Sequence, residues 1–164
     1  MNREEIIIRL GLSRHLEGGY FSETYRSDGR NELDTPRGRR AAVSAIQYML
    51  TDDSPVDVFH SKHSDGLTFF HLGSPITYHL IYEDGSYHKV VLGPDLSAGH
   101  RLQLFVPGGT WKAAELEAGT FGLVSDVAAP GWDMSDMCLA LRGELLEKFP
   151  QHAEVITRLG LVQW

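Results

Sequence analysis

The sequence predicts a mainly β protein, a sandwich or barrel of short strands with helices only at its two ends. Between Tyr20 and Val127, short runs rich in β-branched and aromatic residues alternate with turn-forming residues. Helical spacing of apolar residues occurs only before this region and after Pro130. A parallel α/β sheet would need helices between its strands, so this order favours a sandwich or barrel.

The first element in chain order is a short helix. Asn2 and Glu5 have the spacing of a capping box, in which each side chain bonds to the backbone of the other residue. Ile6 and Leu10 form an apolar side, and Gly11 marks the predicted end of the helix.

Turn-forming residues then divide the central region into strands. Each run between two turns has the length and composition of a strand. The predicted strands are Tyr20–Arg26, Ala42–Leu50, Val56–Ser61, Leu67–Leu72, Ile76–Tyr82, Tyr87–Leu92, Leu102–Val106, Thr110–Glu115 and Phe121–Val127.

The C-terminal part has a helical pattern. Apolar residues repeat at helical spacing from Met137 to Phe149, and Pro150 ends the run. A final short helix is expected over Ala153–Leu159, ending at Gly160. With 164 residues, we expect a single domain over residues 1–164, with a barrel core at about 20–127 and a helical segment at about 134–160.

Charge and hydropathy argue against several classes of partner. Acidic residues outnumber Lys plus Arg by 22 to 15, a net charge of −7, which disfavours nonspecific binding to nucleic acid or membrane surfaces. No apolar run approaches the length of a membrane span, and the N-terminus lacks the features of a secretory signal. The single cysteine, Cys138, rules out an intrachain disulfide and is expected in the core. We expect a cytoplasmic protein without nucleic-acid or membrane partners.

Two charged segments allow more than one interpretation. The segment Glu17–Ser27 places acids, tyrosines and an arginine directly after and around a double glycine, whose backbone can make turns and close approaches that other residues cannot. It is either an edge strand whose solvated charges discourage pairing or part of a site. The cluster of Arg37, Arg39 and Arg40 is expected to be a solvated loop, with phosphate contact as the alternative.

The sequence also resembles a known family. The resemblance rests on His15, Glu17-Gly18-Gly19-Tyr20-Phe21, Glu23-Thr24-Tyr25-Arg26-Ser27, Phe59-His60, Ser64-Asp65, Gly73, Leu92-Gly93, Asp95-Leu96, Val106-Pro107, Gly109, Trp111 and Ala129-Pro130-Gly131-Trp132. These residues are similar, in the same order, to the cupin branch known as a domain of unknown function, cupin type five. The resemblance implies a double-stranded β-helix, or jelly-roll barrel, with a small-molecule pocket inside and usually a homodimer. It implies no agreed reaction.

The same resemblance indicates where metal ligands would lie. Metal-binding cupins have a His-x-His pair and then a glutamate seven residues before a glycine. With Gly73 as that glycine, the glutamate position falls on Gly66. The histidine pair falls on His60 and Lys62, and the histidine of the second motif falls on or near Lys112. Glycine and protonated lysine are not metal ligands, and one histidine cannot hold an ion, so we expect no metal and no cofactor.

His60 and Lys62 are the central candidates for a site. They lie two residues apart and therefore share one face of a strand, which the resemblance places inside the barrel. A cationic pair there suits an anionic small molecule. The alternative is that both side chains reach solvent at the barrel rim. If the protein is an enzyme, we expect His60 as the base and Tyr20 or Tyr25 as the acid.

Further candidates are assigned to ligand contact. Glu23 and Arg26 are expected to fix ligand or dimer geometry. Phe70, Phe105 and Trp111 are expected inside the barrel, as ordinary core or as a stacking surface for a ligand. The complete set of predicted ligand contacts is Glu23, Arg26, Lys62, Phe70, Gln103, Phe105 and Trp111.

Three functions remain open from the sequence. The leading hypothesis is a metal-independent cupin that isomerises or epimerises a sugar phosphate or nucleotide-sugar next to a carbonyl, which rests on fold-level analogy. The first alternative is a noncatalytic binding or sensor module, because Gly66 and Phe69 stand where the family pattern has an acid and a histidine. The second is a metal-dependent cupin enzyme with other ligands.

Overall fold

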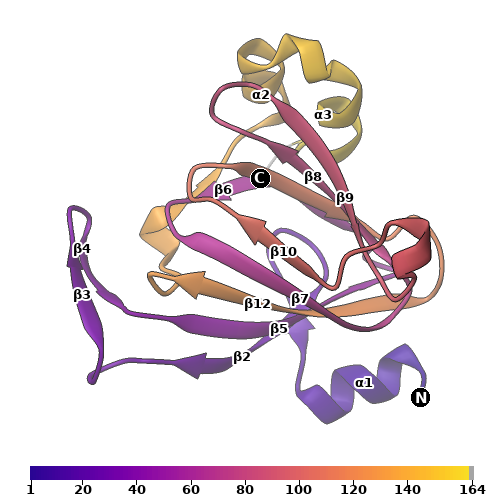
Figure 1. Cartoon of the computed structure of the whole chain (residues 1–164), viewed down its shortest axis with the longest axis horizontal. Helices are drawn as coiled ribbons and strands as arrows, with labels where there is room; N and C mark the ends of the chain where they lie inside the picture. The colour runs from indigo at the N-terminus through magenta and orange to yellow at the C-terminus, as the bar shows by residue number, and fades with distance from the viewer. Residues whose placement is uncertain (163–164) are drawn as a thin grey trace.

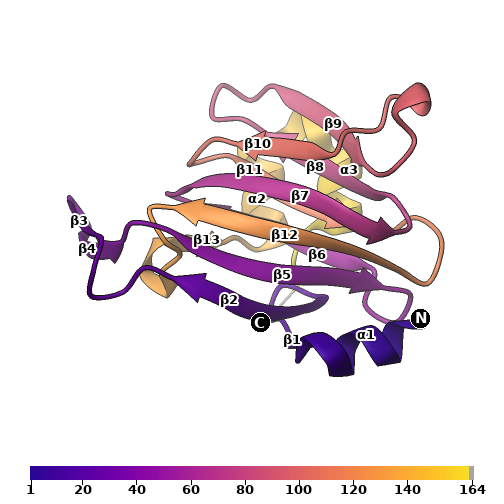
Figure 2. The ribbon, with the colours of Figure 1, turned by 60° about the horizontal axis from the view of Figure 1, so that its bottom comes forward.

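Two antiparallel β-sheets packed face to face form the body of the protein (Figure 1, Figure 2). The computed structural model describes residues 1–162. The larger sheet has the strand order β1 (Ser13–Arg14), β2 (Tyr20–Arg26), β5 (Ser44–Thr51), β12 (Phe121–Ala129), β7 (Asp65–Gly73) and β10 (Gln103–Val106). The second sheet has the order β13 (Met137–Leu139), β6 (Val56–Lys62), β11 (Trp111–Glu115), β8 (Ile76–Ile81) and β9 (Tyr87–Leu92). The prediction of a mainly β sandwich or barrel with helices at its two ends is confirmed.

Alternating side chains divide the second sheet into an inner and an outer face. Leu80 of β8 points inward, where it packs in one core cluster with Tyr48 of β5. Its neighbour Ile81 and Trp111 of β11 belong to a separate outer cluster. The C-terminal helices α2 (Arg142–Lys148) and α3 (Ala153–Leu159) supply the other side of that cluster and cover this face (Figure 1).

The predicted helices and strands are largely confirmed. Helix α1 (Arg3–Leu10) has the expected capping box, in which the Glu5 N–H donates to Asn2 Oδ1 over 2.9 Å and the Asn2 N–H donates to Glu5 Oε2 over 3.0 Å. Gly11 follows with φ of 61°. Every predicted strand is present, with its ends shifted by two residues at most. Within residues 1–162, no helix is long and apolar enough to cross a bilayer.

The continuous helical segment expected from Met137 is wrong. A short 3₁₀ turn, η2 (Met134–Asp136), leads into β13, which pairs with β6. This pairing satisfies backbone groups on a side of β6 that would otherwise be an open edge. Cys138 is exposed on β13, so its predicted place in the core is also wrong. Two further 3₁₀ turns are η1 (Leu96–Ala98) and η3 (Pro150–His152).

A hairpin of β3 (Glu32–Thr35) and β4 (Gly38–Ala41) extends away from the two sheets (Figure 1). The solvated loop expected for the arginine cluster is wrong for Arg39 and Arg40, which lie on β4. Arg40 Nε lies 2.8 Å from Oδ2 of the buried Asp136. This ion pair fixes the hairpin against the η2 turn and occupies the guanidinium that a phosphate would need.

Candidate functional site

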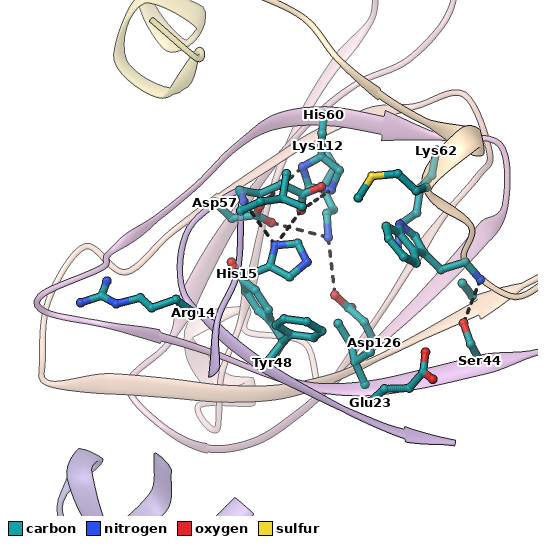
Figure 3. Close-up of a pocket in the computed structure, with 17 residues that line it drawn as sticks. Arg14, His15, Glu23, Ser44, Tyr48, Asp57, His60, Lys62, Lys112 and Asp126 are labelled. Atoms are coloured by element: carbon teal, nitrogen blue, oxygen red, sulfur yellow. Dashed lines mark hydrogen bonds and ion pairs between the residues drawn. The ribbon is translucent and has the colours of Figure 1, made fainter. Parts of the chain in front are cut away.

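A cavity of about 310 Å³ opens between the two sheets (Figure 3). This volume lies near the lower end of the range for small-molecule sites. Its lining side chains come from β1, β2, β5, β6, β11 and β12, from the η2 turn and from two loop segments. They are Arg14, His15, Leu16, Glu17, Phe21, Glu23, Ser44, Ile46, Tyr48, Asp57, His60, Lys62, Lys112, Asp126, Ala128, Trp132 and Met134.

The double glycine places Glu17 in this cavity. Gly18 has φ of 112°, and a Cβ at that position would collide with the carbonyl oxygen of Val56. The close approach lets the Val58 N–H donate to the Glu17 carbonyl over 3.0 Å, while the Tyr48 hydroxyl donates to the Gly18 carbonyl over 2.7 Å. Glu17, only 8% exposed, is therefore held against β6. This contact explains Gly18 in the segment Glu17–Ser27, which the sequence alone left open as either an edge strand or part of a site.

A β-bulge brings Asp57 and His60 to the same side of β6. His60 pairs with Lys112 and Asp57 pairs with Ala114, so three steps along β6 oppose two steps along β11. Residues three apart on a regular strand face opposite ways, and the extra residue of a bulge removes that difference. Both buried side chains therefore line the cavity.

The Glu17 carboxyl group faces two histidine nitrogens that carry lone pairs. His60 Nδ1 lies 2.8 Å from the Val58 carbonyl oxygen and must donate to it, so the unprotonated Nε2 faces Glu17 Oε2 at 3.4 Å. His15 Nδ1 accepts from the Glu17 N–H over 3.3 Å and lies 3.5 Å from the same carboxyl oxygen. Two lone pairs beside a carboxylate repel it, so this geometry favours a proton on Glu17.

The environment raises the pKa values of Glu17 and Asp57 and lowers the pKa values of the two histidines. Burial raises the pKa of Glu17 to about 7 and raises the pKa of Asp57 well above its ordinary value. Burial, together with the charge of Lys112, lowers the pKa of His60 far enough to keep it neutral. Burial also lowers the pKa of His15 to about 4. Opposite shifts in neighbouring groups are typical of acid–base sites.

Lys112 is a fixed cation inside the barrel. Its Nζ lies 3.7 Å from Asp57 Oδ2 and 3.6 Å from Asp126 Oδ2 (Figure 3). Burial opposes the charge of Lys112, but the carboxylates of Asp126, Asp57 and Glu17 outweigh it and raise the lysine pKa. Burial likewise opposes the charge of Asp126, yet Lys112 and Lys62 lower the pKa of that carboxyl. The Thr68 hydroxyl donates a hydrogen bond to it.

The donor set fits a proton better than a divalent metal. Glu17, Asp57 and His60 each offer one ligand atom, and these atoms lie within 4.8 Å of one another. However, two lysine side chains, the buried Lys112 and the partly buried Lys62, already line this cavity with the carboxylates. One proton shared among Glu17, Asp57 and Asp126 makes the set neutral, whereas a dication would leave excess positive charge away from water.

Of the predicted site residues, His60, Lys62 and Glu23 line the cavity. Arg26 lies at the rim, where its Nη2 contacts Glu23 Oε2 at 2.6 Å and its Nη1 donates to the Trp132 carbonyl over 2.9 Å. Glu23 and Arg26 thus form an ion pair at the rim of the cavity, and Arg26 connects this pair to Trp132.

The two tyrosines expected as acids lie outside the cavity. Tyr20 donates its hydroxyl to Asp53 over 2.9 Å on an exposed surface, and Tyr25 is 54% exposed. Neither is among the residues that line the cavity with His60, so the structure does not bring a tyrosine acid and His60 together. The acidic group beside His60 is instead Glu17.

Four predicted ligand contacts also lie elsewhere. Phe105, at 52% exposed, and Gln103 face outward on β10, and Phe70 packs against the apolar core between the sheets. Trp111 packs in the outer cluster below the C-terminal helices. The barrel-interior prediction is therefore wrong for Phe105 and Trp111, since on β11 it is Lys112 that points inward.

Four residues that line the cavity were not predicted from the sequence: Glu17, His15, Asp57 and Asp126. Lys112 was predicted only as a position where a metal ligand is lost. His15 and Glu17 did belong to the resemblance, which was a usable signal. Asp57 had none, because its place depends on the bulge.

Two solved structures that are similar to this chain over nearly its whole length carry no activity in their descriptions. A hypothetical protein from Leishmania major has a TM-score of 0.92 and 31% identity, covering 98% of this chain and 99% of that chain. Protein SO0799 from Shewanella oneidensis has a TM-score of 0.89 and 31% identity, covering 99% of both chains. Oxalate decarboxylase from Bacillus subtilis, at 13% identity and a TM-score of 0.58, shares the fold alone, over 92% of this chain and 37% of its own.

Sequence comparison identifies the family. The uncharacterized protein YML079W of Saccharomyces cerevisiae is 34% identical over 154 residues, which is 86% of this chain and 76% of the yeast protein. The family described as Cupin superfamily (DUF985) matches residues 4–140. The resemblance stated from the sequence is confirmed, and the chain belongs to this family of cupins.

Proposed function

We propose that this protein binds a small anionic carbonyl compound in its barrel and moves a proton at the carbon next to the carbonyl, as a metal-independent isomerase or epimerase. The observation that carries the proposal is the Glu17 carboxyl group facing the lone pair of His60 Nε2 at 3.4 Å inside the cavity. A group that holds a proton near neutral pH beside a neutral base is the arrangement that proton transfer requires.

Each buried group has a role in this proposal. His60 accepts a proton, and Glu17 supplies one. The ammonium group of Lys112 is a preorganised positive charge that would stabilise an enolate oxygen as it forms. Asp57 and Asp126 hold that ammonium in place from two sides.

The size and lining of the cavity limit the classes of ligand that it can bind. At about 310 Å³, the cavity suits a sugar phosphate or a comparable small acid, and a nucleotide-sugar would extend beyond it. Lys62 and Lys112 together give the cavity the positive charge that attracts an anionic group. Phe21, Ile46 and Trp132 give the remaining wall an apolar character.

The test is hydrogen exchange into added compounds in deuterated water, followed by NMR. A panel of sugar phosphates, small 2-oxo acids and their uncharged counterparts is first ranked by the rise in melting temperature. The wild type should exchange the proton next to the carbonyl of a stabilising anion, and Glu17→Gln should not. The matched control is Glu115→Gln, which alters a carboxyl group on the outer face of the sheet.

Two outcomes would replace the proposal. Stabilisation by anions without any exchange would favour the noncatalytic binding module. Exchange that stops after chelation and returns with one added metal ion would favour a metal-dependent enzyme that uses Glu17, Asp57 and His60 as ligands.

A further inference from the structure

Lys62 lines the cavity, and in the proposed proton transfer it contributes only positive charge. It lies on β6, two residues after His60 and on the same face of the strand. Within residues 1–162, the Lys62 ammonium takes part in no ion pair or hydrogen bond. The other cationic side chains at the cavity are held: Lys112 by two aspartates, and Arg14 by Asp53 at 2.7 Å.

We propose that Lys62 is a nucleophile that forms an imine with the carbonyl group of the bound compound. The inference rests on the carbonyl class of ligand in the proposed function and adds a covalent step to it. It assigns Lys62 a role that Arg or another cation could not take.

The step balances with groups present in the cavity. The neutral amine of Lys62 attacks the carbonyl carbon, so that a C–N bond forms and the carbonyl oxygen becomes a hydroxyl group. The C–O bond then breaks, and the oxygen leaves as water with one proton from the amine nitrogen and one from the acid, Glu17. The products are an iminium cation on Lys62, water and the Glu17 carboxylate. No oxidant, reductant or further reactant is needed.

The surroundings favour Lys62 over Lys112 as the nucleophile. Burial and the nearby charge of Lys112 lower the pKa of Lys62, which increases the neutral fraction of its amine. Lys112 instead has a raised pKa, so it stays protonated and cannot attack. A second cation beside a desolvated lysine is a known way to activate the amine.

An iminium group would also assist the proton transfer. It withdraws electrons from the neighbouring carbon more strongly than a carbonyl group does. The α-proton therefore becomes more acidic at a place that His60 can reach from the next inward position of β6. Loss of that proton to His60 gives an enamine in place of an enolate, and Glu17, which imine formation leaves as a carboxylate, faces His60 and can take up the proton.

The experiment is reductive trapping with pyruvate, an anionic ketone, and cyanoborohydride, followed by peptide mapping. The chain has four lysines, Lys62, Lys89, Lys112 and Lys148, so every adduct can be assigned. We expect the reduced adduct at Lys62, at least tenfold above the level at Lys89 and Lys148. Acetone, the uncharged counterpart, should label Lys62 far less. Labelling of Lys62 at or below the level of Lys89 would overturn the proposal, and this comparison needs no variant.

Two variants separate this inference from the proposed function. Lys62→Arg keeps the positive charge and should abolish trapping inside the cavity, while Lys89→Arg should leave it intact. If Lys62→Arg still exchanges protons at the wild-type rate, the imine is refuted and the proposed function stands. If wild-type trapping at Lys62 occurs without proton exchange, the imine is supported and the isomerase proposal fails.

Discussion

Two buried clusters of histidine and carboxylate lie on opposite faces of the second sheet, and they differ in how completely their hydrogen bonds are made. In the outer cluster, His79 is 1% exposed, with Nδ1 2.7 Å from the Tyr87 hydroxyl and Nε2 2.8 Å from Glu115 Oε1. Arg158 of α3 pairs with the other oxygen of Glu115. Each of these groups has a partner, and the cluster ties a C-terminal helix to the sheet.

The inner cluster of Glu17, Asp57 and His60 has similar residue types and looser contacts. His60 lies 3.4 Å from the Glu17 carboxyl and 3.5 Å from the Asp57 carboxyl, beyond good hydrogen-bond distance. Within residues 1–162, Asp57 Oδ1 is buried without a hydrogen-bond partner. Buried polar groups are normally satisfied. Among the described residues, Arg142 Nε also lacks a partner, but Asp57 lines the cavity, and we therefore connect its unsatisfied oxygen with a function. The outer cluster, whose polar groups all have hydrogen-bond partners, is therefore a structural network. The inner cluster, whose hydrogen bonds are incomplete, is the candidate site.

Proton exchange should show the largest difference between the inner and the outer cluster. Glu17→Gln should reduce exchange by about 10²- to 10⁴-fold, because it removes the acid while keeping shape and hydrogen bonding. Glu115→Gln should leave exchange within about twofold of wild type. The measurement is the NMR exchange rate with the most stabilising anion, and equal losses in both variants would remove the distinction between the clusters.

The second effect is on stability. Lys112→Met leaves Asp57 and Asp126 facing each other without their shared cation, which should cost about 3–5 kcal/mol of unfolding free energy. Lys89→Met breaks an exposed pair with Glu117 and should cost about 1 kcal/mol or less. Urea unfolding of both variants measures the difference. A cost at Lys112 no greater than at Lys89 would show that the inner charges are not coupled.

The third effect is the pH dependence of stability. The pKa of Glu17 is raised from 4.5 to about 7 on folding, so the folded state binds more protons than the unfolded state in that window. Wild-type stability should therefore lose a contribution as the pH rises from about 4.5 to 7, and Glu17→Gln should not lose it. The stability of the variant relative to wild type should increase by up to about 3 kcal/mol between pH 4.5 and pH 8. A constant difference across these pH values would contradict the shifted pKa.

The smallest effect concerns the outer cluster. Glu115→Gln weakens the bonds to His79 and Arg158 and should cost about 1–3 kcal/mol. The Arg158 side chain is about half exposed, so most of this loss should come from the buried bond to His79. Thermal unfolding measures the loss, and hydrogen exchange at the α3 amides should show that it is centred on this helix.

The fold was predictable because its signals are local. Turn residues, strand periodicity and the capping box at Asn2 depend on neighbours in the sequence. The strand β13 was missed because it forms only to pair with β6, whereas the local pattern near Met137 is helical. Pairing between distant segments outweighed the local preference there.

The candidate site was predictable only in part, because several of its residues are brought together by contacts between distant segments of the chain. His60 and Lys62 followed from strand alternation, which the structure confirms on β6. Asp57 joins them through a bulge, which sequence periodicity does not reveal. Glu17 enters from a loop because Gly18 allows the chain to approach β6, and Gly19 allows it to approach β5. Lys112 was recognised as a departure from metal ligation, but its ion pairs with Asp57 and Asp126 become visible only when three strands are brought together.

The most direct test of the account is the titration of the Glu17 carboxyl group in the folded protein. Carboxyl-carbon NMR of the wild type, compared with Glu17→Gln to assign the signal, reports its protonation. Elemental analysis of the same sample reports bound metal. We expect a Glu17 carboxyl group that titrates near pH 7, in a protein without stoichiometric metal. A carboxyl that titrates in the ordinary acidic range, or one metal ion per chain that is lost in Glu17→Gln, would contradict this expectation.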